Sequence, residues 1–202
     1  MRLRYSPTSP YVRKVVMTAI ELGLNDRIER EATDAWSSET TLPRDNPLGK
    51  VPALVTDDGM VLYDSPVICE YLDARAGGGK LFPSAGAARW KALRFQALGD
   101  GMCDAAILCR LERNMRPADK RWDVWESRQL GAVTRGLDTL ETMAADLEGP
   151  TTIGTLSVLA TLGYLDFRFA DLNWRQRCPK LAAWFAKASD RPSFRDTAPP
   201  SA

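Results

Sequence analysis

The sequence contains no histidine. Histidine is the commonest general base, proton shuttle and metal ligand in proteins, so any catalysis by this chain has to work without an imidazole. Cysteine is also scarce, and the four residues lack the close spacing of a metal site. We interpret them as buried free thiols without a chemical role; they are Cys69, Cys103, Cys109 and Cys178. We therefore expect no metal cofactor.

An excess of charge of one sign is missing as well, because 27 Lys and Arg residues face 26 Asp and Glu residues without a basic block. This balance argues against nucleic acid or an anionic membrane as a partner. No run approaches the ~20 apolar residues that span a bilayer, and no apolar signal segment follows Met1. The hydrophobic fraction of 45% and the charged fraction of 26% are those of an ordinary globular protein, which we expect in the cytoplasm.

The first third of the chain alternates strand and helix patterns. Apolar residues at helical spacing follow the first short strand, and the Asp-Gly turn at 57–59 predicts a β-hairpin. The expected strands are residues 2–5, 28–31, 52–56 and 60–63, and the expected helices are residues 11–22 and 65–75. The order β-α-β, loop, hairpin and helix predicts a thioredoxin-like domain with a mixed four-stranded sheet, in an α+β arrangement.

Every long segment after this domain has helical periodicity, and no second sheet is predicted. Glycines and a proline interrupt all periodicity near residue 80. We therefore divide the chain into a thioredoxin-like domain at 1–76, a linker at 77–85 and an all-helical domain at 86–202. The expected helices of this bundle are residues 86–114, 118–147, 155–169 and 179–189.

Ser9 is the first candidate for chemistry, because its hydroxyl directly precedes the first predicted helix. The free N–H groups and the dipole at a helix N-terminus favour anions and lower the pKa of a nearby thiol. Ser9 could donate a charge-assisted hydrogen bond to a thiolate that belongs to a ligand. The simpler alternative is that Ser9 only caps the helix, with Pro10 in its first turn. Because neither residue 9 nor residue 12 is cysteine, dithiol exchange is disfavoured.

Two further segments carry weaker signals. Val51-Pro52 opens a predicted strand, where a cis proline would turn the backbone of Val51 outward to pair with an extended peptide; a trans proline in a loop is the alternative. Asp64 and Ser65 precede Pro66 at a second helix N-terminus. They could hold the carboxylate and ammonium of a ligand, or could simply cap the helix.

Together these segments resemble, in order and rough spacing, the glutathione S-transferase superfamily. The resembling segments are Tyr5 to Lys14 for the catalytic loop, Asn46 to Pro52 for the cis-proline segment and Asp64 to Pro66 for the γ-glutamyl site. Downstream, 98–105 and 163–168 resemble the helical domain of small bacterial members with a serine in the catalytic loop. The resemblance covers the whole chain.

The resemblance implies a role for each matching residue. Ser9 corresponds to the group that contacts the glutathione sulfur, and Val51, with Pro52, to the backbone partner of the cysteinyl unit. Asp64 and Ser65 correspond to the γ-glutamyl clamp, and Lys50 is expected at the glycine carboxylate. The candidates for the second-substrate pocket are Tyr11, Met102 and Asp104. Arg13 has two interpretations: it helps to keep the thiolate loop electropositive, or it is an exposed arginine on the face of the first helix.

The resemblance implies a homodimeric detoxification enzyme that binds glutathione, stabilises its thiolate and adds it to a small, apolar electrophile. A glutathione-binding or scaffold protein with little transferase activity is the alternative, and a lyase or reductase would need cysteine at position 9. Two features depart from the family pattern. Thr152 stands where an aspartate often caps the central helix, and Ser6 is a second hydroxyl that competes with Ser9 for the sulfur.

Overall fold

The computed structural model describes residues 1–200. Its first part is a four-stranded mixed sheet in the order β2-β1-β3-β4. β1 runs parallel to β2 and antiparallel to β3, and β3 pairs with β4 as the predicted hairpin. The strands are β1 (Arg2–Tyr5), β2 (Glu29–Ala32), β3 (Ala53–Val55) and β4 (Val61–Leu62). The predicted thioredoxin-like arrangement is confirmed.

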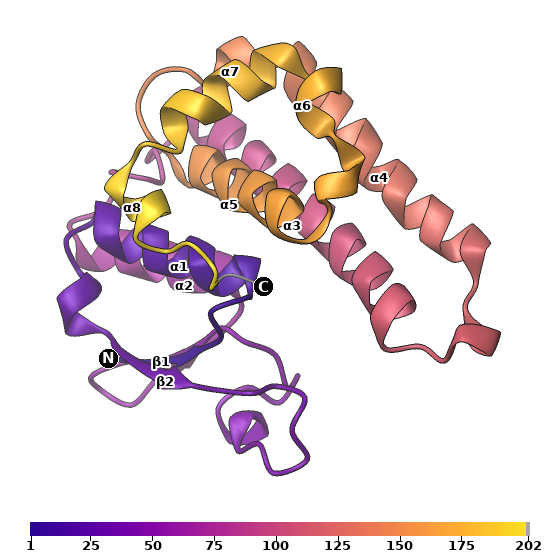
Figure 1. Cartoon of the computed structure of the whole chain (residues 1–202). Coiled ribbons are helices and arrows are strands. Elements are labelled where there is room, and N and C mark those ends of the chain that lie inside the picture. The colour runs from indigo at the N-terminus through magenta and orange to yellow at the C-terminus, as the bar shows by residue number, and fades with distance from the viewer. Residues whose placement is uncertain (201–202) are drawn as a thin grey trace.

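Two helices, α1 (Pro10–Glu21) and α2 (Ser65–Arg75), separate this sheet from the rest of the molecule (Figure 1). α1 begins with a proline in its first turn, and the chain leaves it at Gly23, whose φ of +69° suits glycine. Val12, Val15 and Val16 on α1 are buried. Because α1 also contacts the helical domain, its N-terminus lies where the two parts of the chain meet.

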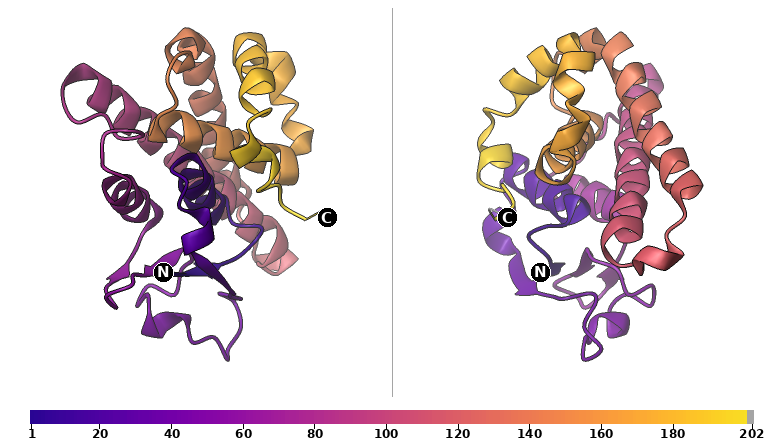
Figure 2. Two further views of the ribbon diagram at one scale, coloured as in Figure 1. Left: turned by 90° about the vertical axis from the view of Figure 1, so that its left-hand side faces the viewer. Right: turned by 45° about the vertical axis from the view of Figure 1, so that its right-hand side comes forward.

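The helical domain is built around α5 (Ile153–Arg168), which is buried over most of its length. It packs against the long helix α3 (Gly86–Asn114), and α4 (Asp123–Thr142) covers the other side of α3 (Figure 2). At Gly154 a Cβ would lie 2.5 Å from the carbonyl oxygen of Ala92, so glycine permits this close approach. Thr152 and Thr155 form a reciprocal capping box at the start of α5, so threonine supplies the cap that the family's aspartate provides.

The chain then returns toward the sheet domain. Helices α6 (Trp174–Arg177) and α7 (Pro179–Ala188) lie over α4 and α5, and α8 (Pro192–Arg195) packs on α1 (Figure 1). Within residues 1–200, no helix has the length and apolar character needed to cross a bilayer.

The predicted elements are present with ends shifted by one or two residues, with one clear exception. The segment 118–147 is not a single helix: α4 is flanked by 3-10 turns at Ala118–Lys120 and Ala144–Leu147. Helical periodicity does not distinguish these tighter turns from an α-helix. The four-residue helices α6 and α8 were not predicted, because they are too short to show a period.

Candidate functional site

Ser9 is the N-cap of α1, and its side chain accepts a hydrogen bond from the backbone N–H of Val12 at 3.3 Å. A hydroxyl that accepts this bond still has its own proton to donate. The backbone N–H of Tyr11 is not bound to any acceptor within residues 1–200. The helix start therefore offers a hydroxyl donor, a free amide and the positive end of the helix dipole to an anion.

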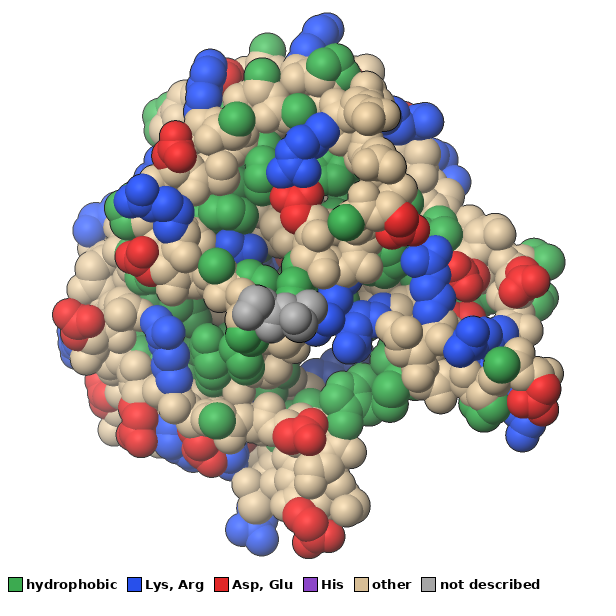
Figure 3. Space-filling model, in the orientation of Figure 1, with side chains coloured by type: hydrophobic (Ala, Val, Ile, Leu, Met, Phe, Trp, Pro, Cys, Tyr) green, Lys and Arg blue, Asp and Glu red, His purple; other side chains and the backbone are tan. Residues whose placement is uncertain are grey.

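Ser9 also lines a pocket between the two domains. Its walls come from the loop before α1, from the last two turns of α5 and from the C-terminal segment; they include Pro7, Ser9, Arg13, Tyr164, Phe167 and Pro199. Figure 3 shows the wider hollow between the two parts of the chain, with Lys and Arg side chains along its upper rim and apolar side chains below. Tyr164 and Phe167 were not predicted for the site. Their only sequence signal is that they lie in the 163–168 segment of the resemblance.

The second segment, Asn46–Pro52, is organised by Asn46, which is 2% exposed. The Asn46 side chain donates to the carbonyl of Lys50 at 2.7 Å and accepts from the N–H of Leu48 at 3.0 Å. The Val51-Pro52 peptide bond is cis, as predicted, and leads directly into β3. The Lys50 side chain is exposed. Asn46 thus positions the backbone that leads into the cis-proline turn, a role that its place in the motif did not reveal.

Asp64 and Ser65 lie at the N-terminus of α2. The Asp64 carboxylate is exposed and makes no capping hydrogen bond. Ser65 as a residue is 2% exposed, and its hydroxyl has no hydrogen-bond partner within residues 1–200. The bond between Tyr63 and Asp64 is a second cis peptide. Asp64 is therefore the N-cap residue of α2, as one of the two interpretations predicted, but its carboxylate does not bond the helix backbone.

Tyr11 and Asp104 are brought together, because the Tyr11 hydroxyl donates to the Asp104 carboxylate across the α1–α3 interface. One turn along both helices, Lys14 bonds both oxygens of Asp100 at 2.6 Å. Burial raises the pKa of Tyr11, and the bond to Asp104 raises it further, so the phenol stays protonated. The structure does not bring Met102 to the pocket: it is buried against Gly136 between α3 and α4.

Arg13 is not an exposed side chain, because only 8% of it is accessible. Its guanidinium donates to the carbonyl of Phe194 at 2.9 Å and lies 3.8 Å from the centre of the Phe194 ring. A Cβ at Gly163 would lie 2.5 Å from this guanidinium, so glycine makes room for it. Burial lowers the pKa of Arg13 to about 10. Arg13 thus holds the C-terminal segment against α1 and is still charged at neutral pH.

Glu21 anchors the same segment at the other end of α1. Its carboxylate accepts two hydrogen bonds from Arg191, at 2.9 and 2.7 Å, and one from Ser193 at 2.5 Å. Burial raises the pKa of Glu21, but these bonds outweigh burial and leave its pKa below the usual value. Arg13 and Glu21 together fasten α8 beside the pocket wall that Pro199 completes.

We expect Glu21→Gln to destabilise the protein by about 1–2 kcal/mol at neutral pH, because it removes charge-assisted hydrogen bonds to a partly exposed arginine. A carboxylate with a lowered pKa contributes stability above its unfolded pKa and loses it as the pH falls through the folded pKa. The difference between wild type and variant in urea unfolding should therefore shrink between about pH 6 and pH 3. A difference that is the same at both ends of this range would contradict the role given to the Glu21 charge.

No group of three His, Cys, Asp or Glu side chains within residues 1–200 is arranged to hold a metal ion. All four cysteines are free and buried, and burial raises the pKa of the Cys69 thiol to about 11 and of the Cys103 thiol to about 12. These thiols are therefore poor nucleophiles at neutral pH. A thiolate at this site has to come from a ligand.

Two family models match the chain. Residues 8–75 match the N-terminal domain of glutathione S-transferase, and residues 123–187 match its C-terminal domain. An Escherichia coli (strain K12) protein named as the uncharacterized GST-like protein YibF is 32% identical over 205 residues, covering 100% of both chains.

Solved structures agree with these matches. A glutathione transferase family member from Pseudomonas fluorescens Pf-5 with bound glutathione is 45% identical, with a TM-score of 0.94 over 98% of each chain. A structure from the same organism with bound S-(propanoic acid)-glutathione is 44% identical, with a TM-score of 0.91 over 99% of this chain and 100% of that one.

Proposed function

Because the chain belongs to the glutathione S-transferase superfamily, we propose that it is a glutathione transferase that ionises the thiol of glutathione at the start of α1. The observation that carries this proposal is the N-terminus of α1, where Ser9 keeps a free hydroxyl proton and Tyr11 a free amide. Ser9 lines a pocket between the domains, and the Tyr11 amide lies two residues further along the same helix start. They would stabilise a thiolate more than a thiol, which lowers the thiol pKa.

The rest of the tripeptide would follow the edge of the sheet domain. We assign the cysteinyl backbone to Val51, which the cis Pro52 orients at the start of β3. The γ-glutamyl ammonium would pair with the free carboxylate of Asp64, and its carboxylate with the Ser65 hydroxyl and the N-terminus of α2. Lys50, which is exposed, would pair with the glycine carboxylate.

The second substrate would be a small electrophile whose reacting part meets the apolar walls of the pocket, Pro7, Pro10 and Phe167. Two structures of the Pseudomonas fluorescens family member support this reading, since one was solved with bound glutathione and the other with a glutathione that carries propanoic acid on its sulfur. The thiolate sulfur would form a bond to an electrophilic carbon, which gives a thioether.

We further propose that the protein acts in the cytoplasm as a homodimer and removes reactive electrophiles. An apolar surface between α2 and α3 supports the dimer: Val67 is 46% exposed and Trp90 is 68% exposed. The salt bridge between Glu70 and Arg89 at 2.8 Å brings the two helices together beside these side chains. Pairing of two copies would cover both groups.

Calorimetry with glutathione, followed by a chromogenic conjugation assay, tests the function. We expect glutathione to bind, and Asp64→Asn to weaken binding by about tenfold because a charge-assisted contact is lost. Asp190→Asn, on an exposed side chain of the helical domain, is the matched control and should bind normally. Binding without turnover would favour a scaffold protein, and no binding at all would reject the proposal.

A further inference from the structure

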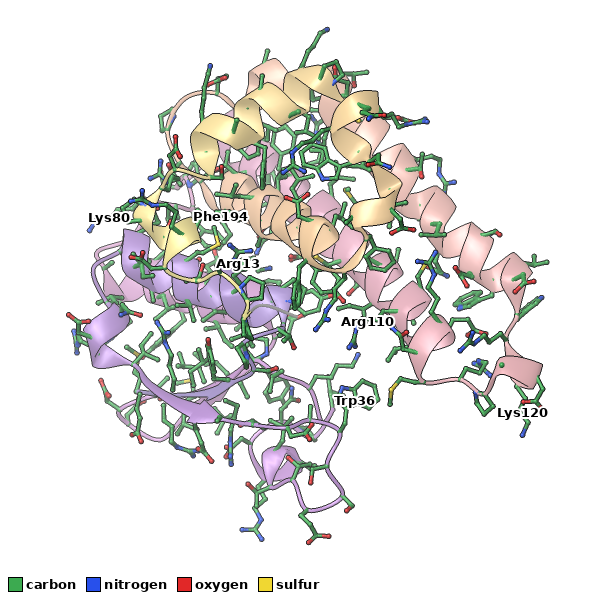
Figure 4. All side chains as sticks on the ribbon, in the orientation of Figure 1. Arg13, Trp36, Lys80, Arg110, Lys120 and Phe194 are labelled. Carbon is green, nitrogen blue, oxygen red and sulfur yellow. The ribbon has the colours of Figure 1, made fainter. Side chains whose placement is uncertain are left out.

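Two arginines beside the pocket have no acidic partner. Arg168, on the last turn of α5, lies over the Phe167 ring, with 3.7 Å between its guanidinium carbon and the ring centre, and Phe167 lines the pocket with Ser9. Arg110 projects from α3 into the opening between the domains, on the side that faces Trp36 (Figure 4). Within residues 1–200 neither guanidinium forms a salt bridge or a side-chain hydrogen bond.

Other charged groups near these two arginines on α3 and α5 are paired. On the same two helices, Arg113 pairs with Glu126 at 2.6 Å, and the α5 carboxylate of Asp166 is occupied by Arg175 at 2.6 and 2.7 Å. Burial and the charge of nearby Arg110 both lower the pKa of Arg168. Two like charges held together without a carboxylate create a positive potential that an anion would relieve.

Tyr164 adds a third donor at the same place. It is 6% exposed, lines the pocket with Ser9, and its hydroxyl has no hydrogen-bond partner within residues 1–200. Burial raises the pKa of Tyr164 to about 12, although Arg110 and Arg168 act against it. The phenol is therefore a neutral donor at physiological pH, and its proton is free for a ligand that accepts it.

We propose that Arg110, Arg168 and the Tyr164 hydroxyl form an anion site, so that the preferred electrophile carries a carboxylate close to its reacting carbon. This inference rests on the proposed function and adds the substrate class. Guanidinium groups suit carboxylates because they donate two parallel hydrogen bonds. The aromatic faces of Phe167 and Tyr164 would meet the apolar part of the same molecule.

An α,β-unsaturated carboxylate is one substrate of this class. The thiolate sulfur of glutathione forms a bond to the β-carbon, the π electron pair moves to the α-carbon, and that carbon takes a proton from water. No electron acceptor is needed, and the product is a thioether acid. The carboxylate of the substrate disfavours the build-up of negative charge on the neighbouring α-carbon during the addition. Pairing of this carboxylate with Arg110 and Arg168 would therefore lower the barrier as well as orient the acid.

The test compares two thioethers of the same size, S-(2-carboxyethyl)glutathione and its neutral amide S-(2-carbamoylethyl)glutathione, by calorimetry. We expect wild type to bind the acid at least about tenfold more tightly than the amide, less so at high salt. Arg110→Gln and Arg168→Gln should each reduce this ratio several-fold, while Arg168→Lys, which keeps the charge, should retain part of it. Arg135→Gln removes an exposed α4 arginine and should leave the ratio unchanged.

The possible outcomes distinguish a failure of the anion site from a failure of the proposed transferase function. Equal affinity for acid and amide in wild type, or a ratio that survives Arg110→Gln and Arg168→Gln together, would overturn the anion site and leave the transferase proposal intact. An equal loss of affinity for glutathione, acid and amide in the two variants would also overturn it, because the arginines would then hold the tripeptide. Failure of wild type to bind any of the three would overturn both proposals.

Discussion

Ser9→Ala should lower kcat/KM for conjugation by about 10- to 100-fold, because one charge-assisted hydrogen bond to the thiolate is worth roughly 1.5–3 kcal/mol. The Kd for glutathione should change little, since the tripeptide would be held mainly at Val51, Asp64 and Ser65. The variant also loses the cap that accepts from Val12, at a cost of about 1 kcal/mol in stability. Activity and unfolding therefore have to be measured on the same preparation.

Two further variants serve as controls for Ser9→Ala. Ser9→Thr keeps both functions and should retain most of the activity. Ser6→Ala removes the competing hydroxyl. The backbone carbonyl of Ser6, which accepts from the Ser9 N–H at 3.2 Å, is kept. The activity of this variant should stay near that of wild type. Unchanged turnover in Ser9→Ala, or loss of turnover only in Ser6→Ala, would remove Ser9 from the mechanism.

Asp100→Asn should be the most destabilising of the substitutions considered for the helix interface. Lys14 is 1% exposed, and Asp100 is the only salt-bridge partner of its ammonium within residues 1–200. Removing the carboxylate charge leaves a buried cation uncompensated, which costs about 3–5 kcal/mol. Because Asp100 retains 20% side-chain exposure, we expect the lower end, about 3 kcal/mol, in the free energy of unfolding by urea.

Asp138→Asn is the matched control, because Asp138 pairs with Arg177 at the same distances on the exposed surface between α4 and α6. It should change stability little. The double variant Lys14→Met with Asp100→Leu should recover most of the loss, since an apolar pair of similar size leaves no buried charge. If Asp100→Asn behaves like Asp138→Asn, the buried pair does not hold α1 to α3.

Much of the fold follows from short-range patterns in the sequence. The apolar stripe that includes Val12, Val15 and Val16, and the Asp-Gly turn at 57–59, each determine one element with little help from distant residues. Long-range packing is different. That Arg13 is buried against Phe194 depends on α8 folding back over α1 and on the space left by Gly163, and helical spacing alone carries no information about either.

The residues of the candidate site divide in the same way, into those that local sequence patterns predict and those that only long-range packing brings into place. Ser9, Val51 and Asp64 lie in local motifs that mark a helix start or a turn before a strand, so their sequence neighbours reveal them. Tyr164 and Arg168 lie on a helix whose periodicity indicates only burial, and Arg110 lies about 55 residues earlier in the chain on another helix. The anion site proposed for them depends on how α3 and α5 pack against each other, which neither helix's own pattern encodes. Met102 was a candidate for the pocket because its side chain is apolar. In the structure it packs against Gly136 and belongs to the core of the helical domain.

The thiol pKa of bound glutathione measures most directly whether the start of α1 stabilises a thiolate. Thiolate absorbance in the ultraviolet, followed against pH in the saturated complex, gives this pKa. We expect a value at least about one unit below the ordinary thiol value near 8.5 in wild type, and a rise of about one to two units in Ser9→Ala. A wild-type complex that titrates like free glutathione, or a pKa that Ser9→Ala does not move, would contradict the mechanism.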